Sequence, residues 1–466
     1  MKKITITLLL ALFTSIAALS QDITGVWNGA LEVGGQNLRL VFNISKSDAG
    51  ISATMDSPDQ GAYDIPVSEV QFDVPKLTII VKQAGIKYEG TLTGDSITGT
   101  FNQMGSSFPM VFSKKTKKVE KPKRPQEPEK PYPYVSKDVT FENAEAGIHL
   151  AGTLTLPDAK GKHPAVVLIS GSGPQNRDEE LMGHKPFLVL ADHLTRNGIA
   201  VLRFDDRGTG ESGGNFSKAT SFDFATDAKA AVDYLKGHKR INPDKIGLLG
   251  HSEGGIVAPI VASQYPGEVD FIVLLAGPGL PGREIVIMQQ QLIGKASGMP
   301  NEQLKLAVST NKQIFDLIVE VDDPDELRLK VSDLLHEIAD NNPGFVPGGM
   351  ETAQFIDKQL EQLLTPWMKN FLTYDPVLAL EKVRCPVLAL NGEKDLQVPP
   401  KENLEIIRET LEDAGNKNVK TIELKGLNHL FQESESGLPA EYGQIEQTMS
   451  PKALNVISTW IEKVVN

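Results

Sequence analysis

Hydrophobic and polar residues alternate with a period of two over the first part of the chain. From residue 21 to about residue 113, short alternating runs are separated by turn residues such as Thr93-Gly94-Asp95, without a helical period. This pattern is typical of half-buried β-strands joined by hairpins. It predicts a small all-β domain over residues 21–113, which is barrel-like because closure of a sheet removes its exposed edges. The runs that carry the pattern are Leu38–Ile44, Ile51–Asp56, Leu77–Val81, Ile86–Thr93, Ser96–Phe101 and Phe108–Phe112.

Beyond residue 135, a hairpin pattern near Val139–Leu156 is followed by short apolar runs that alternate with amphipathic helical periods. Apolar runs between amphipathic helices predict a mostly parallel, doubly wound sheet that helices cover on both faces. The strand-like runs are Ala165–Ile169, Ile199–Phe204, Ile246–Leu249, Phe271–Leu275, Val387–Leu390 and Val419–Leu424. The helical runs are Pro186–Arg196, Phe222–Leu235, Asn403–Leu411 and a last helix that begins after Ser450 with Pro451.

The segment between the strands ending at Leu275 and starting at Val387 has helical periodicity throughout. It includes the amphipathic runs Leu304–Ile318, Glu326–Ile338 and Ala353–Leu364. We predict a helical cap over about residues 281–372, inserted into the doubly wound domain. Insertions of this length are usually functional. This one leaves the sheet beyond the carboxyl ends of the strands, where ligands bind.

Residues 1–20 have the pattern of a secretory signal peptide. Lys2 and Lys3 precede the uncharged apolar run Ile4–Leu19, and small residues stand before Gln21. A retained membrane anchor is the less favoured alternative, because the run is shorter than the roughly 20 residues that span a bilayer. We therefore expect export to the periplasm or the extracellular space, a mature chain from Gln21 and no stable membrane insertion.

Residues 114–134 contain five prolines among eight basic and three acidic side chains. Such a composition buries little apolar surface and favours an extended course, which predicts a semi-rigid Pro/Lys-rich linker. The alternative is that its basic run touches an acidic surface. The linker separates residues 21–113 from a domain over residues 135–466, which we expect to fold and act by itself.

The charge and the single cysteine narrow the range of partners and chemistries. The formal net charge is −13, and it becomes more negative without Lys2 and Lys3, which argues against nucleic acid or an anionic membrane surface as a partner. Cys385 is the only cysteine, so no internal disulfide can form, and its apolar neighbours predict a buried, inert thiol. No metal-binding or cofactor-binding motif stands out, and we expect no cofactor. Nothing in residues 21–113 identifies a partner, and we interpret that domain as a spacer or docking module.

The candidate chemistry starts at Gly250-His251-Ser252-Glu253-Gly254, where an apolar run changes abruptly into a helical pattern. Gly-x-Ser-x-Gly between a strand and a helix is typical of a nucleophile elbow. The serine sits on a tight turn, and the two glycines let the strand and the helix approach closely. We predict Ser252 as the nucleophile.

A serine nucleophile needs a base and an acid that orients it, and in hydrolases of this type these follow the serine in the order acid, then histidine. Asp395 follows the strand Val387–Leu390, and His429 follows the strand Val419–Leu424. No other histidine lies beyond Asp395, so His429 is the predicted base. Glu393 competes with Asp395 for the role of the acid, and Asp395 is preferred.

The oxyanion of a tetrahedral intermediate needs backbone donors. One is the N–H of Glu253, which directly follows the nucleophile. The other is expected from the loop after Ala165–Ile169, where Ser172 is our choice and Gly173 the alternative. This glycine-rich loop lacks the Gly-Lys-Ser/Thr and three-glycine spacings of nucleotide sites.

Together these motifs resemble the α/β-hydrolase superfamily, in its bacterial esterase and serine-aminopeptidase-like branch. The matching landmarks are Ile169–Gln175, Phe204–Ser212, the elbow, Pro366–Pro376 and the Asp395 and His429 segments. The resemblance implies an α/β-hydrolase fold for residues 135–466 and a structural role for Arg207, which would pair with a carboxylate near the site. Ser170 stands where many relatives carry histidine. The resemblance does not reach residues 21–134.

Three functions remain open. An exported carboxylesterase for small-molecule esters with short to medium acyl chains is favoured, because the triad is complete and the cap is rich in apolar residues. An aminopeptidase-like hydrolase would need a carboxylate that binds the substrate ammonium; the candidates are Glu253, Asp178, Glu179 and Glu180. A binding module with an idle hydrolase domain is disfavoured by the intact triad.

Overall fold

The computed structural model describes residues 22–33, 36–48, 50–60, 62–103, 106–115, 122–342, 345–346 and 351–466. The predicted signal peptide over residues 1–20 lies outside these ranges. The chain forms two compact units, one from the described residues of Met1–Asp56 and Asp64–Val119 and the other from those of Ser57–Tyr63 and Glu120–Asn466. Within the described ranges, no helix combines the length and the apolar character needed to cross a bilayer.

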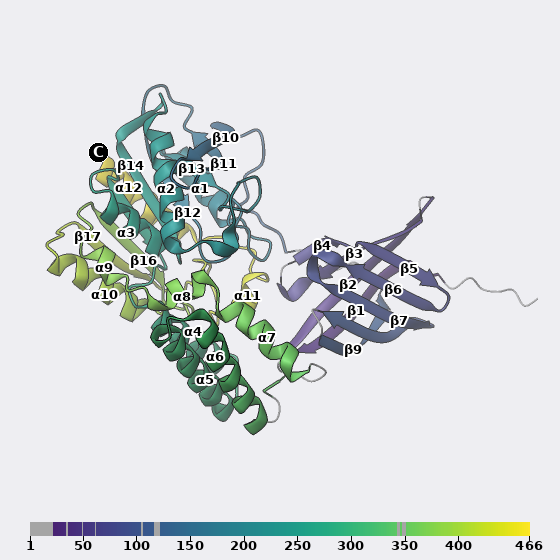
Figure 1. The fold of residues 1–466 in the computed structure, drawn as a ribbon. Coiled ribbons are helices and arrows are strands. Elements are labelled where there is room, and N and C mark those ends of the chain that lie inside the picture. Colours follow the sequence, from purple (N-terminus) through teal and green to yellow (C-terminus); the bar gives the residue numbers. More distant parts are fainter. Residues whose placement is uncertain are drawn as a thin grey trace, which may run out of the picture. The chain divides into compact units, whose positions relative to one another are not determined.

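The first unit is an antiparallel sheet in the order β4-β3-β2-β1-β9-β8-β7-β6-β5. Its core contains Trp27, Phe42, Tyr88 and Phe112. All six predicted strands are present, and the all-β prediction is confirmed, but the strand order leaves β4 and β5 as two edges, so the sheet is a half-barrel (Figure 1). The strands are β1 (Gly25–Val33), β2 (Gln36–Ser47), β3 (Gly50–Ser57), β4 (Ala62–Pro66), β5 (Glu69–Asp73), β6 (Lys76–Val81), β7 (Ile86–Thr93), β8 (Ser96–Gln103) and β9 (Ser106–Lys115), with short 3-10 turns η1 (Pro58–Gln60) and η2 (Lys82–Ala84).

The second unit is built on an eight-stranded sheet in the order β10-β11-β13-β12-β14-β15-β16-β17. The pairs β10–β11 and β11–β13 are antiparallel, and every pair from β13 to β17 is parallel. The predicted mostly parallel sheet is therefore confirmed. Its strands are β10 (Val135–Asn143), β11 (Ile148–Leu156), β12 (His163–Ile169), β13 (Ala200–Phe204), β14 (Ile241–His251), β15 (Phe271–Leu275), β16 (Val387–Gly392) and β17 (Val419–Leu424).

Helices cover both faces of this sheet (Figure 1). One apolar core includes side chains of α1 and α12, and the core on the other face includes α2, α3, α9 and α10. The central strands are buried on both sides, which explains their continuous apolar sequences. These helices are α1 (Pro186–Arg196), α2 (Ser221–Lys236), α3 (Gly254–Gln264), α9 (Val377–Leu380), α10 (Pro400–Asp413), α11 (Pro439–Tyr442) and α12 (Pro451–Val465), with the 3-10 turn η3 (Phe216–Lys218).

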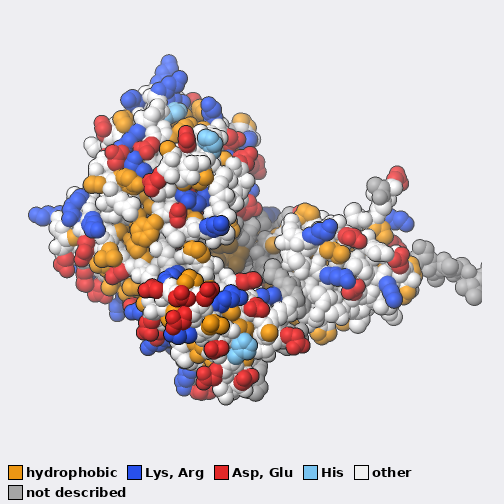
Figure 2. Space-filling view, in the orientation of Figure 1, with side chains coloured by type: hydrophobic (Ala, Val, Ile, Leu, Met, Phe, Trp, Pro, Cys, Tyr) orange, Lys and Arg blue, Asp and Glu red, His pale blue; other side chains and the backbone are white. Residues whose placement is uncertain are grey.

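The predicted cap is an insertion of helices between β15 and β16. Ile314, Val331, Ile356 and Leu372 belong to its separate apolar core. Charged side chains gather on its outer face (Figure 2), as the amphipathic pattern predicts. Its helices are α4 (Gly282–Ala296), α5 (Asn301–Glu320), α6 (Pro324–Asn341), α7 (Thr352–Leu363) and α8 (Pro366–Thr373).

The described part of the predicted linker, residues 122–134, is bound to the second unit. The guanidinium of Arg124 donates to the carbonyl oxygens of Gly183 (3.0 Å), Ile445 (2.9 Å) and Gly443 (2.9 Å). The sequence predicted an extended, semi-rigid linker over this segment and did not indicate these contacts of Arg124. Its charge suits a set of converging carbonyl groups, which composition alone cannot reveal.

We expect Arg124→Ala to lower the free energy of unfolding of the second unit by about 2 kcal/mol, because hydrogen bonds from a charged donor contribute about 1.5–3 kcal/mol and water replaces some of them. The midpoint of urea unfolding of the full chain measures this change. Lys123→Ala is the matched control, since Lys123 is exposed. A chain starting at residue 122 should likewise be more stable than one starting at residue 135. Equal stability of these two chains would contradict a role for Arg124.

Candidate active site

Ser252 lies on the sharp turn between β14 and α3. Its φ is 51°, in the left-handed region that non-glycine residues adopt only where the surroundings enforce it. A Cβ on Gly250 would lie 1.9 Å from the carbonyl oxygen of Gly254, and one on Gly254 would lie 2.2 Å from that of Ile169. Both positions therefore require glycine, and the strained turn presents Ser252 at the carboxyl end of the sheet.

His429 and Asp395 meet on the loops that follow β17 and β16. The Nδ1 atom of His429 is 2.8 Å from Oδ2 of Asp395, and both residues are buried. Oδ1 of Asp395 accepts the backbone N–H groups of Gln397 (2.8 Å) and Val398 (2.9 Å). The carboxylate is thus fixed from one side and oriented toward the imidazole on the other.

Glu393, the competing acid, does not contact His429. Its Oε2 accepts the backbone N–H of Gly426 at 2.8 Å. Across the described ranges, no hydrogen bond joins Oγ of Ser252 to Nε2 of His429. The nucleophile turn and the His429 loop nevertheless lie next to each other, since the ring centroids of His251 and His429 are 4.9 Å apart. Hydrogen bonds of this kind often tighten only when substrate binds.

The loop after β12 lies against the nucleophile turn. A Cβ on Gly171 would stand 3.2 Å from Cβ of Ser252. The Gly171 N–H donates to Oε1 of Glu179 at 2.8 Å and is therefore not free to bind an oxyanion. In the part of the chain that the structure describes, the N–H groups of Ser172, Gly173 and Glu253 donate to no other group of the protein. The predicted donors are thus free, and the choice between Ser172 and Gly173 stays open.

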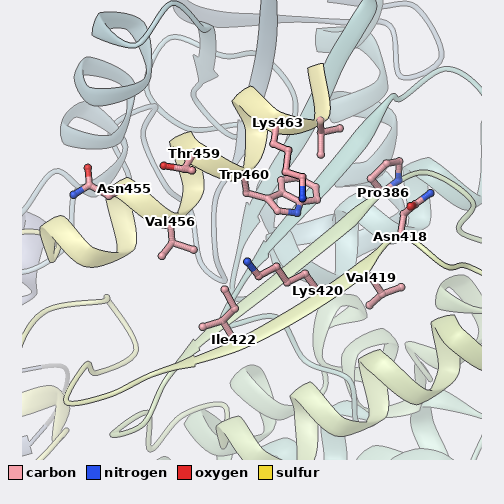
Figure 3. Close-up of a pocket in the computed structure, with 11 residues that line it drawn as sticks. Pro386, Asn418, Val419, Lys420, Ile422, Asn455, Val456, Thr459, Trp460 and Lys463 are labelled. Atoms are coloured by element: carbon pink, nitrogen blue, oxygen red, sulfur yellow. The ribbon is translucent and has the colours of Figure 1, made fainter. Parts of the chain in front are cut away.

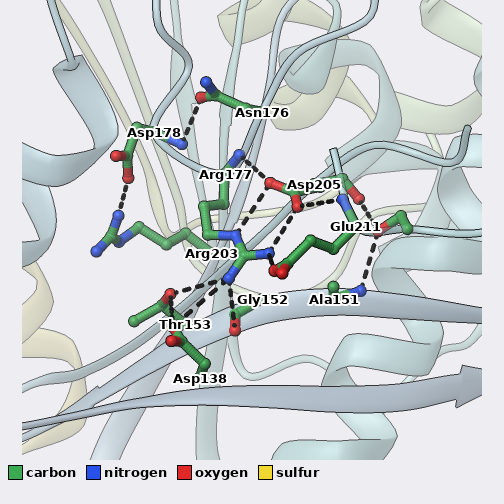
Figure 4. A network of polar contacts seen from close by, with 11 residues as sticks. Asp138, Ala151, Gly152, Thr153, Asn176, Arg177, Asp178, Arg203, Asp205 and Glu211 are labelled. Atoms are coloured by element: carbon green, nitrogen blue, oxygen red, sulfur yellow. Dashed lines mark hydrogen bonds and ion pairs between the residues drawn. The ribbon is translucent and has the colours of Figure 1, made fainter. Parts of the chain in front are cut away.

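A network of ion pairs holds the segment that follows this loop (Figure 4). Arg177 forms a double hydrogen bond with Asp205, at 3.0 and 2.6 Å, and also contacts Glu211 at 2.6 Å. The hydrogen bond with Asp205 raises the pKa of Arg177. Asp178 pairs with Arg203 of β13. Paired charges on both sides fix this segment to the sheet, although none of them reaches the nucleophile.

Arg207 has the structural role that the resemblance implied. Its Nε is 2.6 Å from Oδ2 of Asp227, and its Nη1 is 3.1 Å from Oδ1 of Asp223. Both carboxylates lie on α2, so Arg207 joins the loop after β13 to that helix. Arg207 is therefore a buried structural residue that links these two segments.

Glu253 connects the nucleophile turn with the cap. Its Oε1 accepts hydrogen bonds from Oγ of Ser221 at 2.7 Å and from Nε1 of Trp367 in α8 at 2.8 Å. Glu253 is buried, and within the described residues no lysine or arginine pairs with it. Burial raises the pKa of its carboxyl and favours the neutral form. Sequence reasoning assigned no role to Trp367, although it lies in the motif that closes the cap.

The other carboxylates considered for binding a substrate ammonium have different surroundings. Asp178 pairs with Arg203, and Oε1 of Glu179 is 2.9 Å from Nδ1 of His251. Glu180 is exposed, with a contact of 3.4 Å to Asn176. Asp178 and Glu179 are therefore already committed to partners inside the protein.

Two cavities differ in their relation to the site. A groove of about 770 Å³ between β17 and α12 is lined by Lys420, Trp460 and Lys463 among others (Figure 3), and contains none of the predicted site residues. A cavity of about 270 Å³ has Asp395 in its lining, but neither Ser252 nor His429. It lies between α4 and the Asp395 loop, and its lining includes Met288, Leu292, Glu393, Asp395, Leu396, Pro399 and Glu402.

Cys385 stands just before β16, where burial raises the pKa of its thiol to about 12. Little thiolate exists at neutral pH under these conditions, so the thiol is a poor nucleophile. Among the residues that the structure describes, no group of three or more His, Cys, Asp or Glu side chains is arranged to hold a metal ion.

Several known proteins are similar to this chain in sequence or in structure. Esterase EstD of Thermotoga maritima is 26% identical over 450 residues, which is 95% of this chain and 87% of EstD. Among solved structures, the alpha/beta hydrolase GrgF from Penicillium is 19% identical and matches 71% of this chain and 98% of its own, with a TM-score of 0.43. An esterase of Pyrococcus furiosus is 15% identical and matches 72% of this chain and 92% of its own, with a TM-score of 0.44.

The family model described as "Serine aminopeptidase, S33" matches residues 185–435, which is more than half of the chain. That range contains the nucleophile turn, the cap and the loops of Asp395 and His429. The chain therefore belongs to the serine aminopeptidase family of α/β-hydrolases, and the protein is a serine hydrolase.

Proposed function

We propose that the protein is an exported carboxylesterase that cleaves esters with short to medium acyl chains through Ser252, His429 and Asp395. The observation that carries this proposal is the 2.8 Å contact between His429 and Asp395 beside the strained turn of Ser252. Similarity to an esterase over 95% of the chain supports ester hydrolysis as the reaction.

In the first half of the reaction, Oγ of Ser252 attacks the ester carbonyl carbon while Nε2 of His429 accepts the hydroxyl proton. Asp395 accepts the Nδ1–H of His429, which keeps the unprotonated Nε2 toward the serine and stabilises the imidazolium that forms. The bond to the alcohol then breaks, and the imidazolium donates its proton to the leaving oxygen. The product of this half is an acyl ester on Ser252.

The negative charge of the tetrahedral intermediate falls on the carbonyl oxygen. The N–H groups of Glu253 and of Ser172 or Gly173 are free to bind this oxygen, and one preorganised donor contributes about 3–4 kcal/mol. Burial raises the pKa of the Glu253 carboxyl, which weakens the repulsion between its charged form and an oxyanion at the nucleophile.

In the second half, a water molecule takes the place of the alcohol. His429 accepts a proton from this water, which attacks the acyl carbon. The second tetrahedral intermediate uses the same donors and collapses to release the carboxylic acid. The proton on His429 returns to Oγ of Ser252, and the enzyme is restored.

We propose that the acyl chain extends from Ser252 into the cavity beside Asp395, although Ser252 itself does not line that cavity. Its volume of about 270 Å³ is close to the lower limit of the roughly 300–1,000 Å³ that is usual for ligand pockets. Apolar side chains of Met288, Leu292 and Leu396 suit a short hydrocarbon chain. Long acyl chains would have to extend beyond it, which favours acetyl to octanoyl groups.

Hydrolysis of aminoacyl amides is the second candidate. Glu393 and Glu402 favour it, because both line the same cavity. No lysine or arginine is among the residues that line this cavity. A carboxylate there could bind the ammonium of an N-terminal residue. This arrangement differs from the sequence-based proposal, which placed the anchor at Glu253, Asp178, Glu179 or Glu180.

The two candidates are separated by kinetics on matched substrates. We expect p-nitrophenyl butyrate to exceed alanine p-nitroanilide in kcat/KM by at least about a hundredfold, and p-nitrophenyl palmitate to be cleaved poorly. Ser252→Ala serves as the blank for non-enzymatic hydrolysis. Faster cleavage of the anilide, with loss of that activity in Glu402→Gln, would replace the esterase proposal with the aminopeptidase one.

Export and partners complete the proposal. Residues 1–20 support removal of a signal peptide, so the mature protein purified from the native host should have the mass of a chain that begins at Gln21. Retention of the first 20 residues would contradict removal of a signal peptide and would favour the alternative of a membrane anchor. The negative net charge supports a small-molecule substrate and not a nucleic acid as the partner.

A further inference from the structure

His251 makes two hydrogen bonds from a buried position beside the nucleophile. Its Nδ1 is 2.9 Å from Oε1 of Glu179, and its Nε2 is 3.1 Å from the carbonyl oxygen of His429. A carbonyl oxygen only accepts, so Nε2 must carry a hydrogen. Glu179 also accepts the Gly171 N–H at the same Oε1, 2.8 Å away, as a carboxylate does. With Glu179 as a carboxylate, Nδ1 must also carry a hydrogen, and the ring of His251 is then an imidazolium that donates from both nitrogens.

These contacts join three separate segments of the proposed catalytic apparatus. Gly171 directly precedes the oxyanion candidate Ser172, His251 directly precedes Ser252, and the third contact is the main chain of His429 itself. The carboxylate of Glu179 and the ring of His251 lie at the centre of this set, with side-chain exposures of only 5% and 9%. A shift of either side chain would move at least two of the three segments.

The backbone at Glu179 indicates that its place is enforced. Its φ is 51°, a conformation that costs a non-glycine residue about 1 kcal/mol or more. The turn around it is fixed by Asn176, whose carbonyl oxygen accepts the Glu179 N–H at 2.8 Å and whose Oδ1 accepts the Asp178 N–H at 3.0 Å. The ion pair of Asp178 with Arg203 holds the same turn.

Charged and titratable groups near His251 favour its protonated form. Burial by itself lowers the pKa of this imidazole, but the charge and hydrogen bond of Glu179, the carbonyl of His429 and the charge of Asp395 together raise the pKa above its ordinary value. The His429 ring and the Phe431 ring also face it, with centroids 4.9 and 6.5 Å away. His251 therefore holds both protons to a higher pH than a free histidine, and it loses one donor as the pH rises through this pKa.

We propose that Glu179 and His251 are positioning residues, a buried carboxylate–imidazolium pair that holds the oxyanion loop, the Ser252 turn and the His429 loop together for the reaction. The inference rests on the proposed roles of Ser252 and His429. His251 is not a second base, since both of its nitrogens are already engaged as donors. Glu179 is buried and its Oε1 already contacts Gly171 and His251, which disfavours a role as an anchor for a substrate ammonium.

The test compares the full-length protein with Glu179→Gln, which keeps the shape of the side chain and removes its charge. We expect kcat for p-nitrophenyl butyrate to fall by about 10- to 100-fold with KM nearly unchanged, as for other residues that orient a catalytic group. We also expect kcat of Glu179→Gln to decline at a lower alkaline pH than kcat of the parent protein, since His251 then loses its second proton more easily. Glu145→Gln, which neutralises an exposed carboxylate elsewhere in the unit, is the control.

A second variant and a second readout keep the test decisive. His251→Gln retains a donor for the His429 carbonyl and loses the bond to Glu179, so it should reproduce the fall in kcat if Glu179→Gln does not fold. The ¹⁵N spectrum of histidine-labelled protein should show a doubly protonated ring that disappears in His251→Gln and becomes neutral in Glu179→Gln. A neutral His251 in the parent protein would overturn the proposal, and so would a lower melting temperature with unchanged kcat and pH profile.

Labelling of Ser252 distinguishes failure of the positioning pair from failure of the proposed esterase function. The rate at which a fluorophosphonate probe labels Ser252 reports the reactivity of the serine and does not depend on the natural substrate. If the protein labels at Ser252 but does not cleave esters, the esterase proposal fails, and slower labelling of Glu179→Gln still supports the positioning pair. Equal labelling rates in parent and variant would overturn the pair.

Discussion

Ser252→Ala is expected to lower kcat by at least about a thousandfold without changing the fold, because it removes the nucleophile and leaves only substrate binding and oxyanion stabilisation. Alanine tolerates the left-handed turn about as well as serine, so the φ of 51° adds no new strain. Single-turnover and steady-state rates on p-nitrophenyl butyrate measure the loss. Circular dichroism and the melting temperature verify that the variant is folded.

The pair Ser252→Ala and His429→Ala provides the internal control for this prediction. Groups that act as one unit show losses that do not add, so the double variant should be about as inactive as either single one. If the loss of kcat in the double variant equalled the product of the two single losses, His429 would not be the base. Activity of Ser252→Ala within tenfold of the parent would contradict the assignment of the nucleophile.

Asp395→Asn should lower kcat by about a thousandfold to ten-thousandfold, through the tautomer of His429. Oδ1 of Asp395 accepts two backbone N–H groups, from Gln397 and Val398. An asparagine would keep its oxygen on these donors and turn its NH₂ toward Nδ1 of His429. Nδ1 then becomes the acceptor and Nε2 carries the hydrogen, so the imidazole cannot take the serine proton. The same steady-state assay measures this loss.

Glu393→Gln is the matched control, because it changes the acid that sequence reasoning could not exclude. The amide oxygen of glutamine can still accept the Gly426 N–H, and the side chain does not contact His429. We expect kcat on esters within about threefold of the parent, as for substitutions that leave the reacting groups in place. A loss in Glu393→Gln as large as that in Asp395→Asn would show that the acid had been assigned wrongly.

A part-buried hydrogen bond from Nε1 of Trp367 to Oε1 of Glu253 connects the cap with the nucleophile turn. This contact links the cap directly to the residue whose N–H we propose as an oxyanion donor. Substrates that displace α8 would therefore also disturb the site. The geometry fits an enzyme whose cap contributes to substrate selection as well as to exclusion of water.

Local sequence determined those features that depend on neighbours in the chain. Ser450 and Pro451 start α12 as expected, with the Ser450 hydroxyl accepting the Lys452 N–H. The glycines around Ser252 required a tight turn, because any Cβ there meets backbone atoms. Continuous apolar runs identified the central strands, since both faces of these strands are buried. In contrast, β5 is short and largely exposed, and its alternation of apolar and polar residues was too weak to predict a strand.

Tertiary structure decided which polar groups meet. Asp395 and Glu393 are two residues apart in similar surroundings, and only the fold of the loops places one of them against His429. The role of Glu179 depends on His251, which is 72 residues away in the chain. Arg124 likewise binds carbonyl groups that are brought together only in the folded unit. Periodicity reports whether a residue faces a core, whereas hydrogen bonds between distant segments depend on positions within about an ångström, which only the packed chain defines.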